Sequence, residues 1–281
     1  MAHAGRYWLK LCLVVGTLAS APAGTLAGPS DPVIPQRIIS LDYCADQYVL
    51  RFVERPRILA VSPDATRDFS YERAKAVGVP MVSPRAEDVV LREPDLVVRS
   101  YGGGPGVTAL FERAGIAVVN LGFSNTIEDI LTTIARIAPR LGNAPEGQAL
   151  VTQMRARLAR LKAAAAQRSA LYLTPTGVTS GPGSLVHEML RAAGLVNYSE
   201  RAGWHPLPLE QLAYRQPDLI AAAFFNTQTS HRDAWSPSRH PVAQRQLKEQ
   251  SVVPLQGAWT ACGGWFLMEA IEALAASAHG P

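Results

Sequence analysis

A stretch of twenty-one residues without glycine or proline, from Gln148 to Arg168, most constrains how this chain folds. Apolar side chains recur along it at helical spacing, and most of its basic side chains fall on other faces. The apolar positions are Leu150, Val151, Met154, Leu158, Leu161 and Ala165. The pattern predicts one helix of about 32 Å at 1.5 Å per residue, roughly the width of a small domain.

The segments on either side of this helix look alike, which favours two lobes joined by it. A continuous helix is a poor hinge, because bending it breaks backbone hydrogen bonds unless a proline, glycine or bulge relieves the strain. We therefore expect the lobes to be held at a nearly fixed separation. An ordinary helix within one larger domain has the same periodicity and remains the alternative.

Short β-branched runs alternate with amphipathic segments in both halves of the chain. Strands are expected at 37–41, 58–61, 96–98, 117–119, 170–173 and 219–222. Helices are expected at 43–53 after Asp42 as N-cap, at 107–114, at 126–138 before Pro139, at 185–193 and at 266–275. The alternation predicts an α/β fold of two lobes with mainly parallel sheets, joined by the long helix, with a ligand cleft between them.

One seven-residue pattern occurs in both halves. Leu91 to Val97 and Tyr214 to Ile220 each consist of a helix end, a proline that stops the helix, and the beginning of a strand. The echo supports two lobes of similar topology.

The first residues have the layout of a secretory signal peptide. Arg6 and Lys10 precede an apolar run at 11–19, and small residues at 21–23 or 25–27 offer cleavage sites. The run is far shorter than the ~20 residues of a membrane-spanning helix. Cys12 lies inside the run and not at its small-residue end, so no lipid anchor is expected.

These features together predict the domain boundaries. We expect residues 1–27 to be a signal peptide, 28–143 an N-terminal α/β lobe, 144–168 the connecting helix and 169–281 a C-terminal α/β lobe. The mature protein is expected to be a soluble monomer in the periplasm.

Composition indicates a globular protein that does not bind nucleic acid. The 281 residues are 48% hydrophobic and 18% charged, as is usual for globular domains. The formal charge of +4 falls to +2 once Arg6 and Lys10 are removed. Basic residues are scattered among acidic ones and form no dense block.

The sequence contains partial matches to motifs for metal and dinucleotide binding, but none of them is complete. His187 and Glu188 begin a zinc-binding helix pattern, but Arg191 stands where the second histidine is needed. The glycine-rich segment 102–106 follows a strand but lacks the last glycine of a dinucleotide-binding loop, and no Gly-x-Ser-x-Gly elbow exists. We expect no enzyme activity, no metal site and no cofactor.

Aromatic and small polar residues gather at the expected strand ends. Ligands sit at strand ends in open α/β sheets, and large aromatic side chains suit a flat, bulky, partly apolar molecule. For any one of them alone, core packing or loop filling is at least as good an explanation. The candidate ligand-binding residues are Asp42, Tyr43, Cys44, Tyr101, Trp204, His205, Phe225, Trp259 and Cys262.

The chain resembles the periplasmic substrate-binding proteins of ABC importers for cobalamin and ferric siderophores. The resemblance covers the whole mature chain. It rests on the segment RIISLDYCAD at 37–46, EPDLV at 93–97, Thr179-Ser180-Gly181, Trp204 ahead of Pro206, and QPDLI at 216–220, with the long helix between them. The first-lobe segment Met81 to Arg85 lacks the cleft tryptophan of the cobalamin binders.

This resemblance implies a non-enzymatic receptor for a small-molecule ligand. The receptor would capture a chelated metal compound, such as a ferric siderophore, haem or a corrinoid, and deliver it to an ABC permease in the inner membrane. A receptor for a non-metal organic ligand is one alternative. A secreted α/β enzyme with Cys44 as nucleophile is the other.

The resemblance also implies roles for individual residues. In the cobalamin binders one glutamate on each lobe docks into arginines of the permease, and Glu87 and Glu210, each seven residues before a proline, match those positions. Ordinary solvated glutamates at helix starts are the alternative. Tyr43, Cys44, Tyr101 and Trp204 would lie on the cleft walls.

Cys44 and Cys262 would be the only cysteines left after removal of the signal peptide. In an oxidising compartment two cysteines are often paired, but free buried thiols and ligation of a soft metal or haem remain open. By the resemblance both lie near the cleft. A bond between them would tie the lobes together and stabilise the fold by ~5 kcal/mol in the chain-entropy model.

Overall fold

The computed structural model describes residues 1–2, 34–161, 168–223 and 236–278. Residues 34–281 form one compact unit. The expected signal peptide lies almost entirely outside the described residues, as do the last part of the expected connecting helix and the candidate Phe225. None of the helices in the described part of the chain is both long and apolar enough to cross a membrane.

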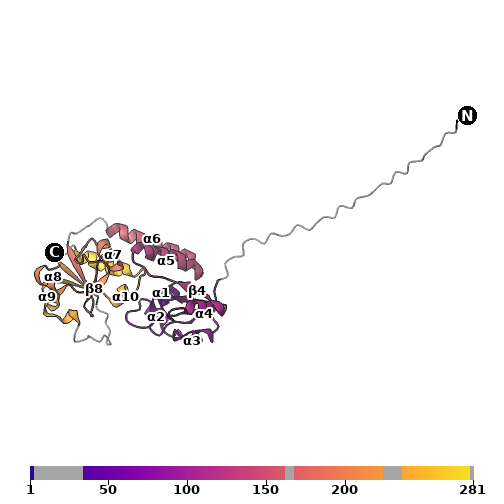
Figure 1. The fold of residues 1–281 in the computed structure, drawn as a ribbon, viewed down its shortest axis with the longest axis horizontal. Coiled ribbons are helices and arrows are strands. Elements are labelled where there is room, and N and C mark those ends of the chain that lie inside the picture. Colours follow the sequence, from indigo (N-terminus) through magenta and orange to yellow (C-terminus); the bar gives the residue numbers. More distant parts are fainter. Residues whose placement is uncertain (3–33, 162–167, 224–235, 279–281) are drawn as a thin grey trace. The chain divides into compact units, whose positions relative to one another are not determined.

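A four-stranded parallel sheet, in the order β2-β1-β3-β4, is the centre of the N-terminal lobe (Figure 1). Its strands are β1 (Ile38–Ser40), β2 (Ile58–Ala60), β3 (Leu96–Arg99) and β4 (Ala117–Asn120). The helices of this lobe are α1 (Tyr43–Phe52), α2 (Arg73–Ala76), α3 (Ala86–Val90), α4 (Val107–Arg113) and α5 (Ile127–Arg140), with a short 3-10 helix η1 (Arg55–Arg57). All four expected strands of this half are confirmed within one or two residues.

The C-terminal lobe repeats this plan with a second parallel sheet, in the order β10-β9-β5-β7. Its strands are β5 (Ser169–Leu173), β7 (Val196–Asn197), β9 (Leu219–Ala222) and β10 (Ser251–Pro254). A separate antiparallel pair joins β6 (Val178–Ser180) to β8 (Trp204–Pro206). The helices are α7 (Leu185–Ala192), α8 (Leu209–Tyr214), α9 (Pro241–Glu249), α10 (Gly257–Thr260) and α11 (Leu267–Ala278), with a 3-10 helix η2 (Pro237–Arg239).

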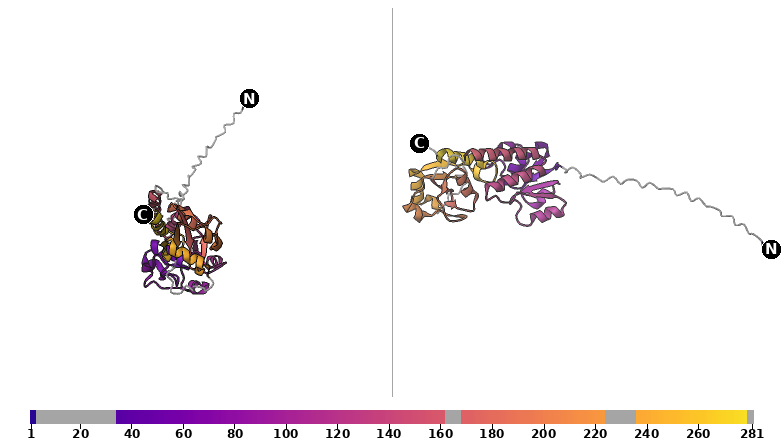
Figure 2. Two further views of the ribbon diagram at one scale, coloured as in Figure 1. Left: turned by 90° about the vertical axis from the view of Figure 1, so that its left-hand side faces the viewer. Right: turned by 90° about the horizontal axis from the view of Figure 1, so that it is seen from above.

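The long helix α6 (Ala144–Leu161) lies between the two lobes in chain order and packs beside α5 (Figures 1 and 2). It begins at Ala144, four residues before the stretch without glycine and proline, and it is described as far as Leu161. Gly147 permits the close packing, because a Cβ there would lie 2.4 Å from the Cβ of Ala138 on α5. Leu150, Val151 and Met154 are buried, as the helical pattern predicts.

Helix α5 corrects one expectation, because it continues through Pro139 to Arg140 instead of ending at Ala138. A proline removes the hydrogen bond to the carbonyl four residues earlier, here that of Ala135. Both Pro139 and Ala135 are exposed, so water can satisfy that carbonyl. The proline is therefore tolerated in the last turn of the helix.

One apolar cluster runs through both lobes. It contains Ile38 and Val98 from the first sheet, Ala170 and Leu219 from the second, and buried residues of α1, α5, α6, α7 and α11. Arg157 of α6 forms ion pairs with Glu269 and Glu272 of α11 at 3.0 and 2.7 Å. Two smaller clusters fill the other face of each sheet. The lobes therefore share a core, which opposes large relative motion.

Asp46 of α1 is fully buried and has no cationic partner among the residues that the structure describes. Its carboxylate accepts hydrogen bonds from the hydroxyl of Ser40, from the backbone N–H of Ser62 at 3.0 Å and from the hydroxyl of Ser62 at 2.6 Å. These bonds join β1, α1 and the end of β2. Burial outweighs them and raises the pKa of Asp46 from 3.8 to about 7.

Replacing Asp46 with asparagine is expected to remove part of the pH dependence of stability. A carboxyl whose pKa is raised in the folded state stabilises the fold below its unfolded pKa, and that contribution is lost as pH rises through its folded pKa. We expect the Asp46 contribution to be about 3 kcal/mol smaller at pH 7 than at pH 4. Urea unfolding of both proteins across pH 4–8 measures this difference, and parallel curves would show that Asp46 does not titrate in this range.

Candidate functional site

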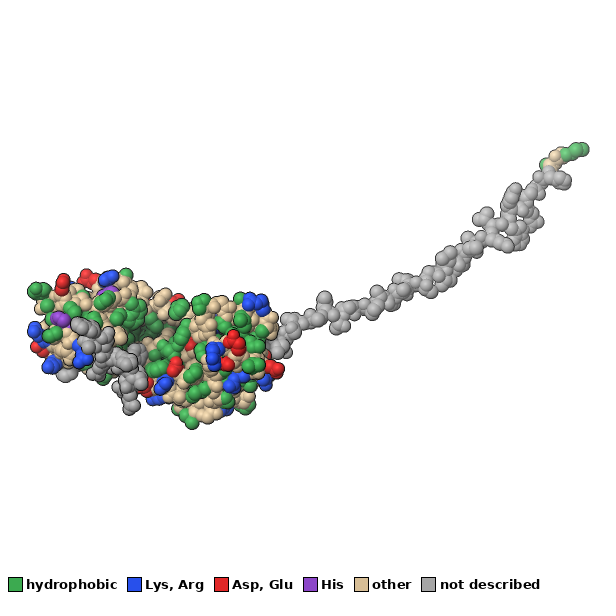
Figure 3. Space-filling view, turned by 60° about the horizontal axis from the view of Figure 1, so that its bottom comes forward, with side chains coloured by type: hydrophobic (Ala, Val, Ile, Leu, Met, Phe, Trp, Pro, Cys, Tyr) green, Lys and Arg blue, Asp and Glu red, His purple; other side chains and the backbone are tan. Residues whose placement is uncertain are grey.

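A pocket of about 390 Å³ lies between the lobes. The N-terminal lobe contributes residues 43–44, 100–101 and 121–125. The last two segments directly follow β3 and β4, and the first begins three positions after the end of β1. The C-terminal lobe contributes residues 183–186, 203–204 and 260–263. Figure 3 shows hydrophobic side chains in the hollow between the lobes, with most charged side chains elsewhere on that face. The pocket therefore lies at the strand ends of the N-terminal lobe, as the fold class predicts.

Asp42 does not line the pocket, but its side chain holds two backbone segments that do. Its side chain is 3% exposed and caps α1 by accepting from the N–H of Ala45 at 2.9 Å. Its other oxygen accepts from the backbone N–H groups of Ser100, Tyr101 and Gly102 at 2.7, 3.1 and 2.9 Å. Both oxygens of the carboxylate thus accept from backbone N–H groups. Asp42 joins the start of α1 to the loop that carries Tyr101.

Arg99 holds the same loop from its other side. Its guanidinium donates to the carbonyls of Gly102 at 2.8 Å, Tyr101 at 3.3 Å and Gly104 at 3.2 Å. Gly102 has to be glycine, because a Cβ there would lie 2.4 Å from the carbonyl oxygen of Leu41. The loop is therefore fixed from two sides: its backbone N–H groups donate to Asp42, and its carbonyl groups accept from Arg99.

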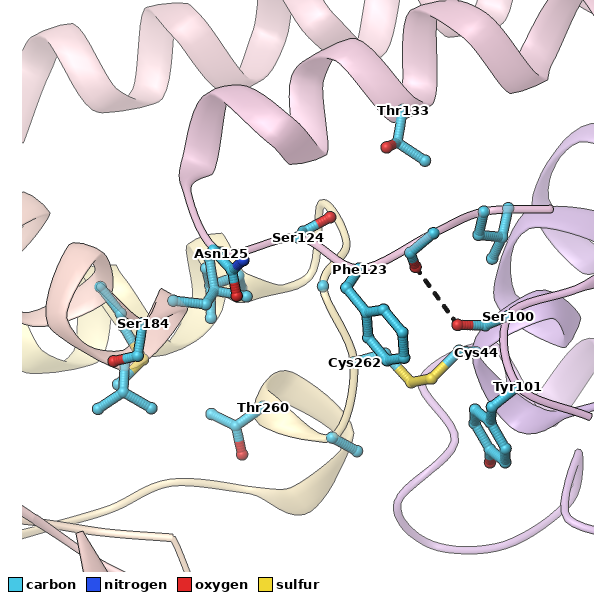
Figure 4. A pocket seen from close by; sticks show the side chains of 18 of the residues that line it. Cys44, Ser100, Tyr101, Phe123, Ser124, Asn125, Thr133, Ser184, Thr260 and Cys262 are labelled. Atoms are coloured by element: carbon cyan, nitrogen blue, oxygen red, sulfur yellow. Dashed lines mark hydrogen bonds between the residues drawn. A yellow bond between two sulfur atoms is a disulfide. The ribbon is translucent and has the colours of Figure 1, made fainter. Parts of the chain in front are cut away.

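The rings of Tyr43, Tyr101 and Phe123 line the pocket on the side of the N-terminal lobe. Tyr43 packs edge-on against Phe69, with ring centroids 5.0 Å apart, and against Tyr101 at 5.8 Å. Tyr101 is 46% exposed and Phe123 is 84% exposed. In Figure 4 the ring of Phe123 extends from the segment after β4 into the pocket. Burial raises the pKa of both Tyr43 and Tyr101, so the two phenols are neutral at neutral pH.

The C-terminal lobe contributes Trp204 of β8 to the lining, together with residues 183–186 and 260–263. Ser180 pairs with Trp204 across β6 and β8, which brings the indole to the pocket. Trp204 is 59% exposed and meets Tyr172 of β5 edge-on, with centroids 6.0 Å apart. Burial raises the pKa of Tyr172 to about 12. Ser184, the N-cap of α7, and Thr260 lie on the side of the pocket opposite Tyr101 (Figure 4).

Cys44 and Cys262 are joined in a disulfide, with the sulfur atoms 2.06 Å apart and the Cα atoms 5.6 Å apart. Of the three possibilities left open by the sequence, the structure contains the bonded pair. Cys44 is in the first turn of α1, and Cys262 lies between α10 and α11. Both residues line the pocket, and Figure 4 shows the bond at its edge beside Tyr101.

The structure brings together five of the nine candidate ligand-binding residues in the pocket lining. These are Tyr43, Cys44, Tyr101, Trp204 and Cys262. Asp42 is buried and is not part of the lining. His205 is buried, with its ring nitrogens 2.6 Å from the hydroxyl of Ser199 and 2.9 Å from the carbonyl of Pro206. Trp259 is half-buried against the large apolar cluster, and Phe225 lies outside the described residues.

Other lining residues were not identified from the sequence. The largest group is the segment from Leu121 to Asn125 after β4, and the second is Ser184 to Val186 at the start of α7. The strand-end rule that selected Tyr101 after β3 applies equally to Phe123 after β4. Applying that rule to every strand would have found the first group.

The lining within the described part of the chain contains no Asp, Glu, His, Lys or Arg side chain. Its polar groups are phenols, aliphatic hydroxyls, the indole N–H of Trp204, the amide of Asn125 and backbone groups. Nor do any three His, Cys, Asp or Glu residues among those described come close enough together to hold a metal ion. The described pocket can therefore offer aromatic contact and neutral hydrogen bonds.

Glu87 and Glu210 lie in the first turns of the short helices α3 and α8, one in each lobe. Both side chains are exposed. Neither has an ion-pair partner among the residues that the structure places. Their carboxylates are therefore accessible at the surface.

Two parallel α/β sheets with a pocket between their lobes define a two-lobed binding protein. The sequence profile of the periplasmic binding protein family matches residues 38–233, and the chain belongs to this family. The resemblance inferred from the sequence is thereby confirmed. No curated protein matches this sequence.

Solved structures share the fold. A periplasmic heme binding protein from Pseudomonas aeruginosa is 21% identical, with a TM-score of 0.67 over 87% of this chain and 92% of that one. A periplasmic vitamin B12 binding protein of Vibrio cholerae is 20% identical, with a TM-score of 0.65 over 87% and 96%. An ABC-type Fe3+-hydroxamate transport protein from Saccharomonospora viridis is 19% identical, with a TM-score of 0.62 over 88% and 94%.

Proposed function

We propose that this protein is the periplasmic receptor of an ABC importer and captures a chelated metal compound, such as a ferric siderophore, haem or a corrinoid. The observation that carries the proposal is the aromatic pocket between the lobes. Tyr101, Phe123 and Trp204 expose ring surface there from both lobes. Flat or bulky chelates with apolar ligand frames are bound by such surfaces. The similar structures, which are named for heme, vitamin B12 and Fe3+-hydroxamate, support the same class.

Hand-off to the permease is proposed to use Glu87 and Glu210. One exposed carboxylate on each lobe, free of ion pairs within the described residues, suits docking onto basic side chains of a membrane partner. The shared core keeps the separation of the two carboxylates nearly constant. A monomer bearing both carboxylates at a fixed separation would thus present a defined docking pattern.

An enzyme centred on Cys44 is disfavoured by the geometry. Nucleophilic catalysis needs a thiolate with a base in reach. The sulfur of Cys44 is bonded to Cys262, which leaves no thiolate at that position in the oxidised protein. We therefore assign binding and delivery, and no covalent chemistry on the ligand.

Binding of a chelate is tested with hemin, cyanocobalamin and ferrioxamine B, each titrated into protein isolated from the periplasm. We expect one of them to bind and to quench tryptophan fluorescence. We also expect the protein as isolated to carry the absorbance band of its ligand. Replacing Trp204 with alanine should weaken that binding by about 10- to 100-fold, because an exposed aromatic contact contributes about 1–3 kcal/mol.

The matched control is Tyr214→Ala, which removes another exposed aromatic side chain of the C-terminal lobe that does not line the pocket. This variant should bind as the wild type does. A colourless protein that binds none of the three probes would contradict the proposal and favour a non-metal organic ligand.

A further inference from the structure

The disulfide between Cys44 and Cys262 belongs to the wall of the pocket as well as to the fold. Its two cysteines come from different lobes and are separated by 218 positions in the chain. Both side chains are half-buried, and both line the pocket. A small thiol and a ligand in the pocket would therefore both lie next to the disulfide.

The segment 261–263 has weak non-covalent ties to the N-terminal lobe. The hydroxyl of Tyr43 donates to the carbonyl of Ala261 at 3.5 Å, and that of Tyr48 donates to the carbonyl of Gly263 at 3.4 Å. Both distances are at the long limit for hydrogen bonds. Gly263 also packs against Ser124, where a Cβ on residue 263 would lie 2.8 Å from that of Ser124. The covalent bond is thus the strongest link between this segment and α1.

Pocket shape depends directly on this link. Tyr43 and Cys44 on one side of the bond line the pocket, and so do Ala261, Cys262 and Gly263 on the other. If the bond breaks, segment 261–263 keeps only the two long hydrogen bonds and the contact with Ser124, while Trp265 stays packed against Tyr48 and Phe52 of α1. The redox state of the cysteines and the occupancy of the pocket therefore act on the same atoms.

We propose that the Cys44–Cys262 disulfide is a redox site coupled to ligand binding. Reduction by a dithiol releases segment 261–263 from the N-terminal lobe and lowers the affinity of the pocket for its ligand. One thiolate of the reductant attacks a cysteine sulfur, and a mixed disulfide forms as the protein S–S bond breaks. The second thiol of the reductant then displaces the protein sulfur. Two electrons and two protons end on Cys44 and Cys262, and the reductant leaves as a disulfide.

Coupling of this kind is reciprocal. If the reduced protein binds a ligand tenfold more weakly, that ligand lowers the reduction potential of the disulfide by about 30 mV. A bound ligand also protects the sulfurs by covering them. The coupling to ligand binding rests on the proposed function, whereas the redox site can be tested without any ligand.

The ligand-free test compares hydrogen exchange in the oxidised and dithiothreitol-reduced protein, with circular dichroism confirming that both are folded. Reduction is expected to speed exchange at least about tenfold in residues 257–264 and to leave α4 unchanged. Unchanged exchange in 257–264 would overturn the proposal, as would a pair of cysteines that mass spectrometry finds freely alkylated before reduction.

The ligand test titrates hemin, cyanocobalamin and ferrioxamine B into the oxidised protein and into the double variant Cys44→Ser/Cys262→Ser, which needs no reductant. We expect the Kd of the probe that binds to be at least about tenfold higher for the variant. If the variant does not fold, reduced and alkylated wild type replaces it. Equal Kd values would refute the coupling. Failure of all three probes with oxidised protein would instead refute the proposed function, and hydrogen exchange would still decide the redox site.

Discussion

Replacing both Glu87 and Glu210 with lysine is expected to abolish uptake of the bound ligand and to leave its affinity for the receptor unchanged. Each carboxylate is exposed on its own lobe and lies outside the pocket. Reversing a charge at a protein interface costs several kcal/mol through repulsion and lost pairing. We expect transport by cells or proteoliposomes that contain the cognate permease to fall at least about a hundredfold.

The control for charge reversal is Glu112→Lys/Glu249→Lys. These glutamates are also exposed, with Glu112 on α4 of the N-terminal lobe and Glu249 on α9 of the C-terminal lobe. The control changes net charge by the same amount, so it separates a general charge effect from docking. The docking role fails if both double variants transport equally, or if the Glu87/Glu210 variant loses ligand affinity.

Replacing Asp42 with alanine is expected to destabilise the fold by about 4 kcal/mol and to weaken ligand binding. The substitution leaves the N–H groups of Ala45, Ser100, Tyr101 and Gly102 without their acceptor. The loop that carries Tyr101 would then keep the hydrogen bonds from Arg99 and the long bond from Ser100 to Gly122. Urea unfolding measures the loss of stability, and titration with the probe that binds wild type measures the loss of affinity.

Asparagine at position 42 separates the two functions of this side chain. Its carbonyl oxygen can accept from the loop or from Ala45, but its amide nitrogen cannot accept at all. Asp42→Asn should therefore fall between wild type and Asp42→Ala in both stability and affinity. An alanine variant within 1 kcal/mol of wild type would show that the loop does not depend on Asp42.

The order of strands and helices was predictable because the same Pro-Asp pair precedes one central strand in each lobe. In each echoed segment a buried proline precedes an aspartate, Asp95 in the first and Asp218 in the second. Asp95 accepts from the N–H groups of Gln36 and Arg37, just before β1. Asp218 accepts from the N–H and hydroxyl of Ser169, where β5 begins. Each aspartate thus sets two neighbouring strands in register, and the pattern is visible in the sequence.

The candidate site was predictable only in part, because polarity does not reveal which partner a side chain has. Asp42 and His205 are polar residues at strand ends, as ligand contacts often are. In the structure the carboxylate of Asp42 is used by backbone N–H groups, and His205 is used by Ser199 and Pro206. Such internal partners come from segments distant in sequence or from short turns without a periodic pattern.

The position of Trp204 depends on pairing that no local pattern reveals. Strands β6 and β8 have three residues each and lie on either side of α7 in the chain. Elements this short have too few alternations to distinguish a strand from a loop. The long helix, by contrast, had enough turns for its buried face at Leu150, Val151 and Met154 to be predicted correctly.

The shared core also sets when during synthesis the fold can be completed. Trp265 and Phe266, just before the last helix, pack against Tyr48, Phe52 and Tyr71 of the N-terminal lobe. Until these residues have been made, the aromatic side chains of the first lobe lack their partners. A nascent or truncated chain that ends before Trp265 would expose them to proteases and chaperones. Completion of the first lobe therefore requires synthesis at least through Phe266.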